Sequence, residues 1–286
     1  MSYRLNHFKY IFILFSIVTV QASAQNVELY NHISNNVITI SSKILNQQRK
    51  IYVHLPKHDS TDKGNTYPVL YLLDGENHFH IVSAYIDYLS YWNVIPKTIV
   101  VGIISSDRKK DLTPSHSLLN FDGKIDSAYK TTGGNEQFLQ FIQQELMPYV
   151  QANYKPGAFK ILAGHSFGGI TAINCMLTHP TMFDAYIAVS PSLWWDDKYT
   201  LKLTAQKLKE LSTFNKTFFY STGNEGGSFR GDLQILNSLI IQLDLKGFKH
   251  KFIDYPNESH MTEPIPAYYD ALRFIFSDWE DNAAKK

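Results

Sequence analysis

Residues 160–178 read KILAGHSFGGITAINCMLT and combine a strand pattern, a glycine-rich turn and a helix pattern. The apolar run Lys160–Ala163 is typical of a buried strand, and Gly168–Thr178 has the pattern of a helix. Between them lies a Gly-x-Ser-x-Gly motif with Ser166 at its centre. A strand before this motif and a helix after it are the context in which a serine hydroxyl stands exposed at a sharp turn. We therefore predict that Ser166 is a nucleophile. A serine that only caps the helix is the alternative.

Apolar runs of similar length recur on both sides of this stretch, with helical patterns between them. Runs such as VLYLL at 69–73 are apolar throughout, which is typical of strands buried on both faces of a parallel sheet. The alternation predicts an α/β fold: a mostly parallel central sheet of about eight strands with helices on both faces. The first two runs precede any helical pattern and are expected to pair as an antiparallel hairpin at one edge.

The expected strands are Val37–Ile44, Lys50–Leu55, Val69–Leu73, Thr98–Ile104, Lys160–Ala163, Ala185–Ser190, Thr217–Ser221 and His250–Tyr255. The expected helices are Glu136–Asn153, Gly168–Thr178, Leu201–Leu211, Gly231–Leu245 and Pro266–Trp279. Residues 105–135 show no clear periodicity. A segment of that length inside a compact domain is usually functional, so we predict that it faces a substrate.

Composition excludes several classes of protein. The chain has 286 residues, 44% of them hydrophobic, and its 27 Lys and Arg nearly balance 26 Asp and Glu. Such a balance offers no basic surface for nucleic acid, and the apolar content is too high for a disordered chain. The single cysteine, Cys175, can form neither an internal disulfide nor a cysteine-based zinc site, and we expect it to be a buried packing residue.

Residues 1–24 are predicted to be a signal peptide. Arg4 and Lys9 precede an apolar run from Tyr10 to Val20, and Ala22-Ser23-Ala24 matches the small residues of a cleavage site. The run is shorter than a bilayer span, which argues against the alternative of an uncleaved membrane anchor. Residues 25–286 are then predicted to be a single exported domain, periplasmic or secreted, with no stable membrane insertion.

A serine nucleophile needs a base, and the base needs an acid that orients it. In this strand-turn-helix context the acid and then the histidine follow the serine in the chain. His260, in a turn between the last strand and the last helix, is the predicted base, whereas His250 lies within the strand. Glu225, after the run TFFYS, is the predicted acid. Other acids remain alternatives: Asp196, Asp197, Asp232 and Glu258.

Acyl transfer also requires hydrogen-bond donors for the oxyanion. The backbone N–H of Phe167, directly after the nucleophile, is one predicted donor. Residues 72–80 read LLDGENHFH, where Gly75 permits a close approach and the N–H of Glu76 is the second predicted donor. His78 and His80 in this loop have no third ligand nearby in the sequence, so we predict no metal site and no cofactor.

Four motifs carry a resemblance to a known family: LLDGENHF at 72–79, DRKKDLTP at 107–114, GHSFGG at 164–169 and SPSLWWDD at 190–197. They resemble the esterases of the α/β-hydrolase superfamily that include the enterochelin and salmochelin siderophore esterases and are related to S-formylglutathione hydrolases and feruloyl esterases. The resemblance covers about residues 28–280. It implies an α/β-hydrolase fold, Ser166 as nucleophile, His260 as base and oxyanion donors at Glu76 and Phe167. The acid varies in position within this family, so the resemblance leaves Glu225 open.

Three further residues are predicted to bind the substrate. Arg108 follows a strand end and is placed to meet an anionic or catecholate group, with an exposed loop arginine as the alternative. Trp194 and Trp195 follow the strand at 185–190 and are candidates for the wall of an acyl or aromatic pocket, with core packing as the alternative.

The sequence therefore predicts an exported serine ester hydrolase that forms an acyl-enzyme on a small-molecule carboxylic ester. A catecholate siderophore trilactone is one candidate substrate, and a short-acyl or feruloyl ester is the alternative. A binding protein of the same fold without catalysis is the hypothesis from another class, because fold alone does not confer activity. Transfer of the acyl group to a second alcohol, and the oligomeric state, are left open.

Overall fold

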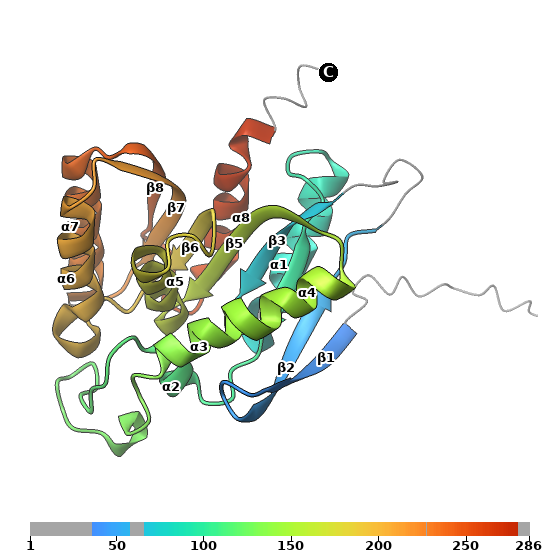
Figure 1. Cartoon of the computed structure of the whole chain (residues 1–286). Coiled ribbons are helices and arrows are strands. Elements are labelled where there is room, and N and C mark those ends of the chain that lie inside the picture. Colours follow the sequence, from blue (N-terminus) through green and yellow to red (C-terminus); the bar gives the residue numbers. More distant parts are fainter. Residues whose placement is uncertain (1–35, 58–65, 227, 280–286) are drawn as a thin grey trace, which may run out of the picture. The chain divides into compact units, whose positions relative to one another are not determined.

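The computed structural model describes residues 36–57, 66–226 and 228–279, whose strands form an eight-stranded sheet in the order β1-β2-β4-β3-β5-β6-β7-β8 (Figure 1). The strands are β1 (Asn36–Ser42), β2 (Gln47–His54), β3 (Tyr67–Leu72), β4 (Ile99–Ile103), β5 (Pro156–His165), β6 (Ala185–Val189), β7 (Thr213–Gly223) and β8 (Lys246–Tyr255). Every strand predicted from the sequence is present. The predicted signal peptide lies outside the described residues.

The sheet is parallel except at one edge. β1 and β2 form the expected antiparallel hairpin, and β2 is also antiparallel to β4, whereas β4, β3, β5, β6, β7 and β8 run parallel to their neighbours. The carboxyl ends of the parallel strands therefore meet at the same edge of the sheet. Ligands of open α/β sheets bind outside this edge.

The helices are α1 (Gly75–Tyr91), α2 (Arg108–Leu112), α3 (Asn135–Phe141), α4 (Met147–Asn153), α5 (Phe167–Thr178), α6 (Trp195–Lys209), α7 (Ser228–Leu243) and α8 (Pro264–Ile275). A π-helical turn, Ile142–Leu146, joins α3 to α4, so the one helix predicted there is a continuous helical segment. Within α6, Asp196, Asp197 and Lys198 have left-handed backbone angles that kink the helix.

Both faces of the sheet are covered because alternate strand residues point to opposite sides. On β3, Val69 and Tyr71 join one apolar cluster together with residues of α3, α5 and α7. Leu70 and Leu72 join a second cluster with residues of α1 and α8, which lie together on the other face (Figure 1). This two-sided burial explains why the central strands are apolar at successive positions.

Helix α1 is the one long helix that the sequence analysis missed. Its polar residues and the two histidines obscured a helical spacing of buried side chains at Phe79, Val82, Ile86 and Leu89. These positions follow the i, i+3, i+7, i+10 pattern of an amphipathic helix, so the signal was present. The helix matters for function because its first turn borders the turn at Ser166 between β5 and α5, which we call the elbow.

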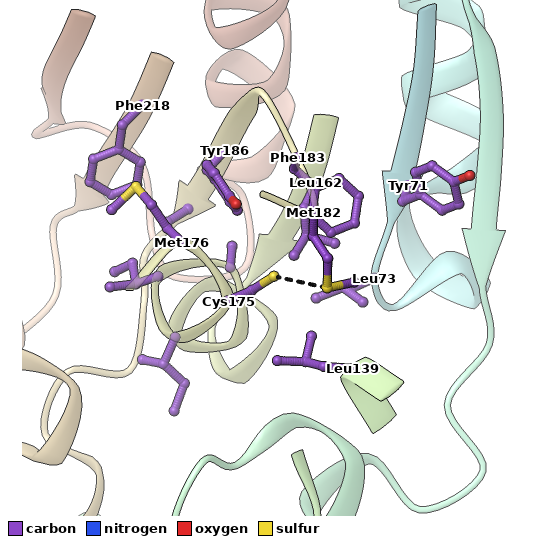
Figure 2. Packing of buried hydrophobic residues seen from close by; sticks show 14 of the residues in the cluster. Tyr71, Leu73, Leu139, Leu162, Cys175, Met176, Met182, Phe183, Tyr186 and Phe218 are labelled. Carbon is purple, nitrogen blue, oxygen red and sulfur yellow. Dashed lines mark hydrogen bonds between the residues drawn. The ribbon is translucent and has the colours of Figure 1, made fainter. Parts of the chain in front are cut away.

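Cys175 is buried on α5, and its Sγ lies 3.9 Å from Met182 Sδ in a cluster with Leu73, Leu139 and Leu162 (Figure 2). Burial raises the pKa of the thiol well above its ordinary value. The expectation of a packing residue is confirmed. Among the helices that the structure describes, none combines the length and the apolar character needed to cross a bilayer.

Candidate active site

Ser166 lies at the turn between β5 and α5 with φ 60° and ψ −116°, a conformation that costs energy for any residue other than glycine. The turn is tight because the backbone before the serine approaches the backbone after it. A Cβ added at Gly164 would lie 2.4 Å from the carbonyl carbon of Gly168, so no larger residue fits there. The strained turn places Ser166 at the N-terminus of α5, where the helix dipole favours negative charge.

His260 and Glu225 are brought together from two separate loops. Glu225 follows β7, His260 lies between β8 and α8, and Nδ1 of His260 donates to Glu225 Oε1 over 2.9 Å. A carboxylate only accepts, so Nδ1 carries the proton and Nε2 is left as the acceptor. The side chain of Glu225 is 6% exposed. This is the arrangement in which a carboxylate orients a histidine base.

Ser166 and His260 line the same cleft, which has a volume of about 500 Å³. In the part of the chain that the structure describes, the hydrogen-bond partner of Ser166 Oγ is the hydroxyl of Ser192, at 3.1 Å, rather than the imidazole of His260. Bonds between catalytic groups are often long or poorly aligned before substrate binds. Ser192 was not predicted; it is held beside the elbow by a bond from its N–H to the carbonyl of Ser166.

Arg108 lies at the start of α2 and lines the cleft, but its charge is already paired. Its Nε and Nη2 donate to the two carboxylate oxygens of Asp74 over 2.7 and 2.8 Å, and its guanidinium lies 5.4 Å from the ring of Phe167. Burial disfavours the charged guanidinium, yet the bonds to Asp74 outweigh it and raise the pKa of Arg108. Asp74 is 1% exposed. Asp74 belongs to the motif LLDGENHF, but nothing in the sequence alone indicates its pairing with Arg108.

Two further histidines support the cleft. His165 is buried beside Ser166, and its Nε2 donates to the backbone carbonyl of His260 over 2.8 Å. Burial and the nearby His260 lower the pKa of His165 well below its ordinary value, so it is neutral. His78 packs edge-on against His165. Because His165 holds the main chain of His260, it fixes the loop that carries the predicted base.

A second cleft of about 370 Å³ lies on the other side of His260 and is aromatic. Phe121, from the irregular segment, and Phe229, from α7, line it, and the ring centroid of Phe229 lies 5.2 Å from that of His260. Trp194 is half-buried and packs on Phe121 and Phe167. Trp195 is fully buried, where its indole N–H donates to the carbonyl of Ser115. It has no exposed surface for a substrate, so core packing, the alternative reading, describes Trp195.

The predicted oxyanion donors both belong to first helical turns. Glu76 is the second residue of α1 and Phe167 the first residue of α5, and amide groups at these positions have no acceptor within the helix. The start of α1 packs against the elbow, since a Cβ on Gly168 would lie 3.4 Å from Oδ2 of Asp74, the residue that directly precedes the helix. The side chain of Glu76 is exposed, so the prediction concerns its N–H alone.

Two of the other candidate acids, Asp232 and Asp197, form ion pairs with lysines. Asp232 is paired with Lys198 over 2.8 Å and Asp197 with Lys202, while the backbone carbonyl of Glu258 accepts from Asn224. His80 packs on Tyr52 and Phe79, on a different side of α1 from His78. Among the described residues, no group of three or more His, Cys, Asp or Glu side chains is arranged to hold a metal ion.

Two residues beneath the predicted acid were not anticipated. Ser190, after β6, contacts both Glu225 Oε1 and Glu263 Oε2 through its hydroxyl. Glu263 directly precedes α8 and is fully buried. A glutamate in the turn YPNESHMTEP resembles any exposed acid at a helix start, so the sequence held no signal of this burial.

The sheet order, the strained elbow and the supported histidine define an α/β-hydrolase. This chain belongs to the family described as "Putative esterase", whose model matches residues 42–219. It is 25% identical to the ferri-bacillibactin esterase BesA of Bacillus subtilis over 80% of this chain and 86% of that protein. It is 23% identical to the apo-salmochelin esterase of Escherichia coli O6:H1 over 71% of this chain and 67% of that protein.

A solved structure shows the same likeness. The IroE-like serine hydrolase from Shewanella oneidensis superimposes with a TM-score of 0.81 at 30% identity, covering 85% of this chain and 80% of that one. The predicted resemblance to siderophore esterases and the predicted fold class are thus confirmed. Membership of this family supports hydrolase activity on esters.

Proposed function

We propose that this protein is an exported serine esterase that acts through an acyl-enzyme, and that its substrate is a siderophore ester of the catecholate trilactone class. The bond from His260 Nδ1 to Glu225, beside a strained Ser166 in the same cleft, is the observation that carries the mechanism. Relatives that are named as esterases of bacillibactin and salmochelin support the choice of substrate.

The chemistry follows from these positions. Ser166 Oγ turns from Ser192 toward His260 Nε2, gives up its proton there and attacks the ester carbonyl. The oxyanion accepts from the N–H groups of Phe167 and Glu76. Collapse of the intermediate breaks the ester bond, and the alcohol leaves with the proton from His260. Water then gives its proton to His260, attacks the acyl-enzyme and restores Ser166.

Hydrolysis of p-nitrophenyl butyrate by the wild type and by Ser166→Ala tests the mechanism. We expect the variant to lose about three or more orders of magnitude in kcat. A serine-reactive phosphonate should label the wild type at Ser166. Two equally inert proteins without labelling would instead indicate a binding protein.

Substrate class is tested with a cyclic catecholate trilactone beside ethyl ferulate and p-nitrophenyl acetate. A kcat/KM for the trilactone at least tenfold above both simple esters supports the siderophore proposal. A preference for the acetate or the ferulate would identify a general carboxylesterase. Export is tested by N-terminal sequencing of the protein from a culture, where Gln25 is expected as the first residue.

A further inference from the structure

A chain of buried side chains continues beyond the predicted acid. From the cleft inward it runs from His260 to Glu225, from Glu225 to Ser190 and from Ser190 to Glu263. The four residues come from four places in the sequence: the loops after β8, β7 and β6, and the residue before α8. Ser190 and Glu263 are both 0% exposed.

The number of available protons determines which group donates each hydrogen bond in this series of side chains. A serine hydroxyl donates one hydrogen bond, and an ionised carboxylate donates none. Ser190 Oγ touches an oxygen of Glu225 and an oxygen of Glu263, so its single proton satisfies only one of these contacts. The other contact needs a proton on one of the two acids.

That proton belongs on Glu263. Glu225 Oε1 already accepts a hydrogen bond from His260 Nδ1. Glu263 accepts no bond from a histidine, lysine or arginine in the described residues, and its polar neighbours are the hydroxyls of Ser190 and Ser221. The titratable groups that face it are Glu225, His260, Tyr255 and Tyr268. Burial, with the charge of Glu225 acting in the same direction, raises the pKa of Glu263 to about 7.

We propose that Glu263 is a positioning residue: its protonated carboxyl donates to Ser190, Ser190 donates to Glu225, and Glu225 is thereby held in the orientation that directs His260 toward Ser166. This proposal rests on the proposed function, since it concerns the same three catalytic groups. It adds a second acid that never contacts substrate and acts through two intervening side chains.

Glutamine is the informative substitution at position 263. The amide of Glu263→Gln donates to Ser190 as the protonated acid does, but it cannot ionise. Glu263→Leu and Ser190→Ala remove the donor and the relay, respectively. With p-nitrophenyl butyrate we expect both of these to lower kcat by about 10- to 100-fold with KM nearly unchanged, because a misplaced base slows chemistry more than binding. Glu263→Gln should recover most of the lost kcat.

The pH profile gives the readout that a merely structural residue would not move. In the wild type, ionisation of Glu263 removes the donor to Ser190, so kcat should fall as the pH rises above about 7. This fall should be absent from Glu263→Gln. Asp232→Asn is the matched control, because it neutralises another buried acid that is paired with Lys198 instead, and it should keep the alkaline fall.

The possible outcomes distinguish failure of the positioning role from failure of the proposed function. Wild-type kcat in Glu263→Leu, equal impairment of the Gln and Leu variants, or an unchanged alkaline fall in Glu263→Gln would each overturn the positioning role while leaving the esterase intact. A wild type as inert as Ser166→Ala would overturn the proposed function, and this inference with it. If Glu263→Leu does not fold, Ser190→Ala and the Gln pH profile decide the question.

Discussion

The two sides of His260 balance buried negative charge differently. In the larger cleft, the carboxylate of Asp74 is held by two bonds from the guanidinium of Arg108, a cation that keeps its charge over the whole working range of pH. Behind His260, the carboxyl groups of Glu225 and Glu263 share a serine hydroxyl, and in the described residues neither forms an ion pair with a lysine or arginine. The first side is therefore fixed in charge, whereas the second depends on where a proton lies.

The difference assigns a task to each side. A charge-balanced pair such as Asp74–Arg108 can present a guanidinium edge to an anionic group without changing the state of the site. A pair of acids beside a histidine can hold or release a proton within the physiological range, which suits the group that must exchange protons during catalysis. Substitutions on the two sides of His260 test this division.

The largest effect is expected from Glu225→Gln. Glutamine lacks the negative charge that stabilises the imidazolium, and its amide N–H can hold His260 in the wrong tautomer, so kcat should fall by about 10³- to 10⁴-fold. The loss should be equal for charged, aromatic and short-acyl esters, because the two clefts share the same histidine. Steady-state kinetics on three such esters tests this expectation. A loss confined to one ester would place Glu225 in substrate binding instead.

Glu263→Gln should change the pH dependence of stability. The pKa of Glu263 is raised from 4.5 to about 7, so the folded state holds a proton that the unfolded chain has lost, and wild-type stability decreases as the pH rises through this window. The variant does not titrate there. Between pH 4.5 and pH 8, the free energy of unfolding of the variant should therefore rise by about 3 kcal/mol relative to that of the wild type.

Urea unfolding of both proteins at several pH values measures this difference. Asp232→Asn serves as the control, since removing that acid breaks a pair with Lys198 and should cost stability. A constant difference between Glu263→Gln and the wild type would show that Glu263 is ionised throughout, against the proton count given above.

A smaller effect is expected from Arg108→Gln on substrate affinity. Removing a charge-assisted contact should raise KM about 10- to 100-fold for an ester with a carboxylate or catecholate group, and hardly at all for p-nitrophenyl acetate. The substitution also leaves Asp74 buried without its cation. The double variant Asp74→Asn/Arg108→Gln removes that penalty, so an affinity loss that persists in it belongs to the substrate contact. An equal loss for the neutral ester would contradict the prediction.

The smallest effect is expected from Phe229→Leu in the aromatic cleft. An edge-to-face ring contact contributes about 1 kcal/mol, so kcat/KM for an aromatic acyl ester should fall about fivefold relative to the acetate. Ile235→Ala is the matched control, because Ile235 lies on the same helix, is 52% exposed and lines neither cleft. Equal losses in both variants would point to a general effect on α7.

Local sequence patterns predicted most of the fold and the elbow. Continuous apolar runs marked the central strands β3 to β7, and Gly164 and Gly168 marked the tight turn because no side chain fits between their backbones. Helix α1 was missed since its polar residues obscured the spacing of Phe79, Val82 and Ile86, although that spacing was legible. The family resemblance added the role of the site, and the choice of His260 came from its place after the last strand.

What the sequence did not reveal depends on contacts between distant loops. Glu263 and Ser190 are 73 residues apart, and no sequence pattern near either residue predicts their contact. The sequence does not distinguish the two adjacent tryptophans, yet the fold buries Trp195 completely and leaves Trp194 beside Phe121. The burial of Trp195 follows from packing around the kinked start of α6, which no local propensity encodes.

The reactivity of the buried Cys175 thiol provides a direct measure of unfolding. It is the single cysteine of the chain and is fully buried on the core-facing side of α5, so a thiol reagent reaches it only when that part of the core opens. The labelling rate under native conditions thus measures the opening of the core that supports Ser166. The same rate compares every variant described above without an introduced probe.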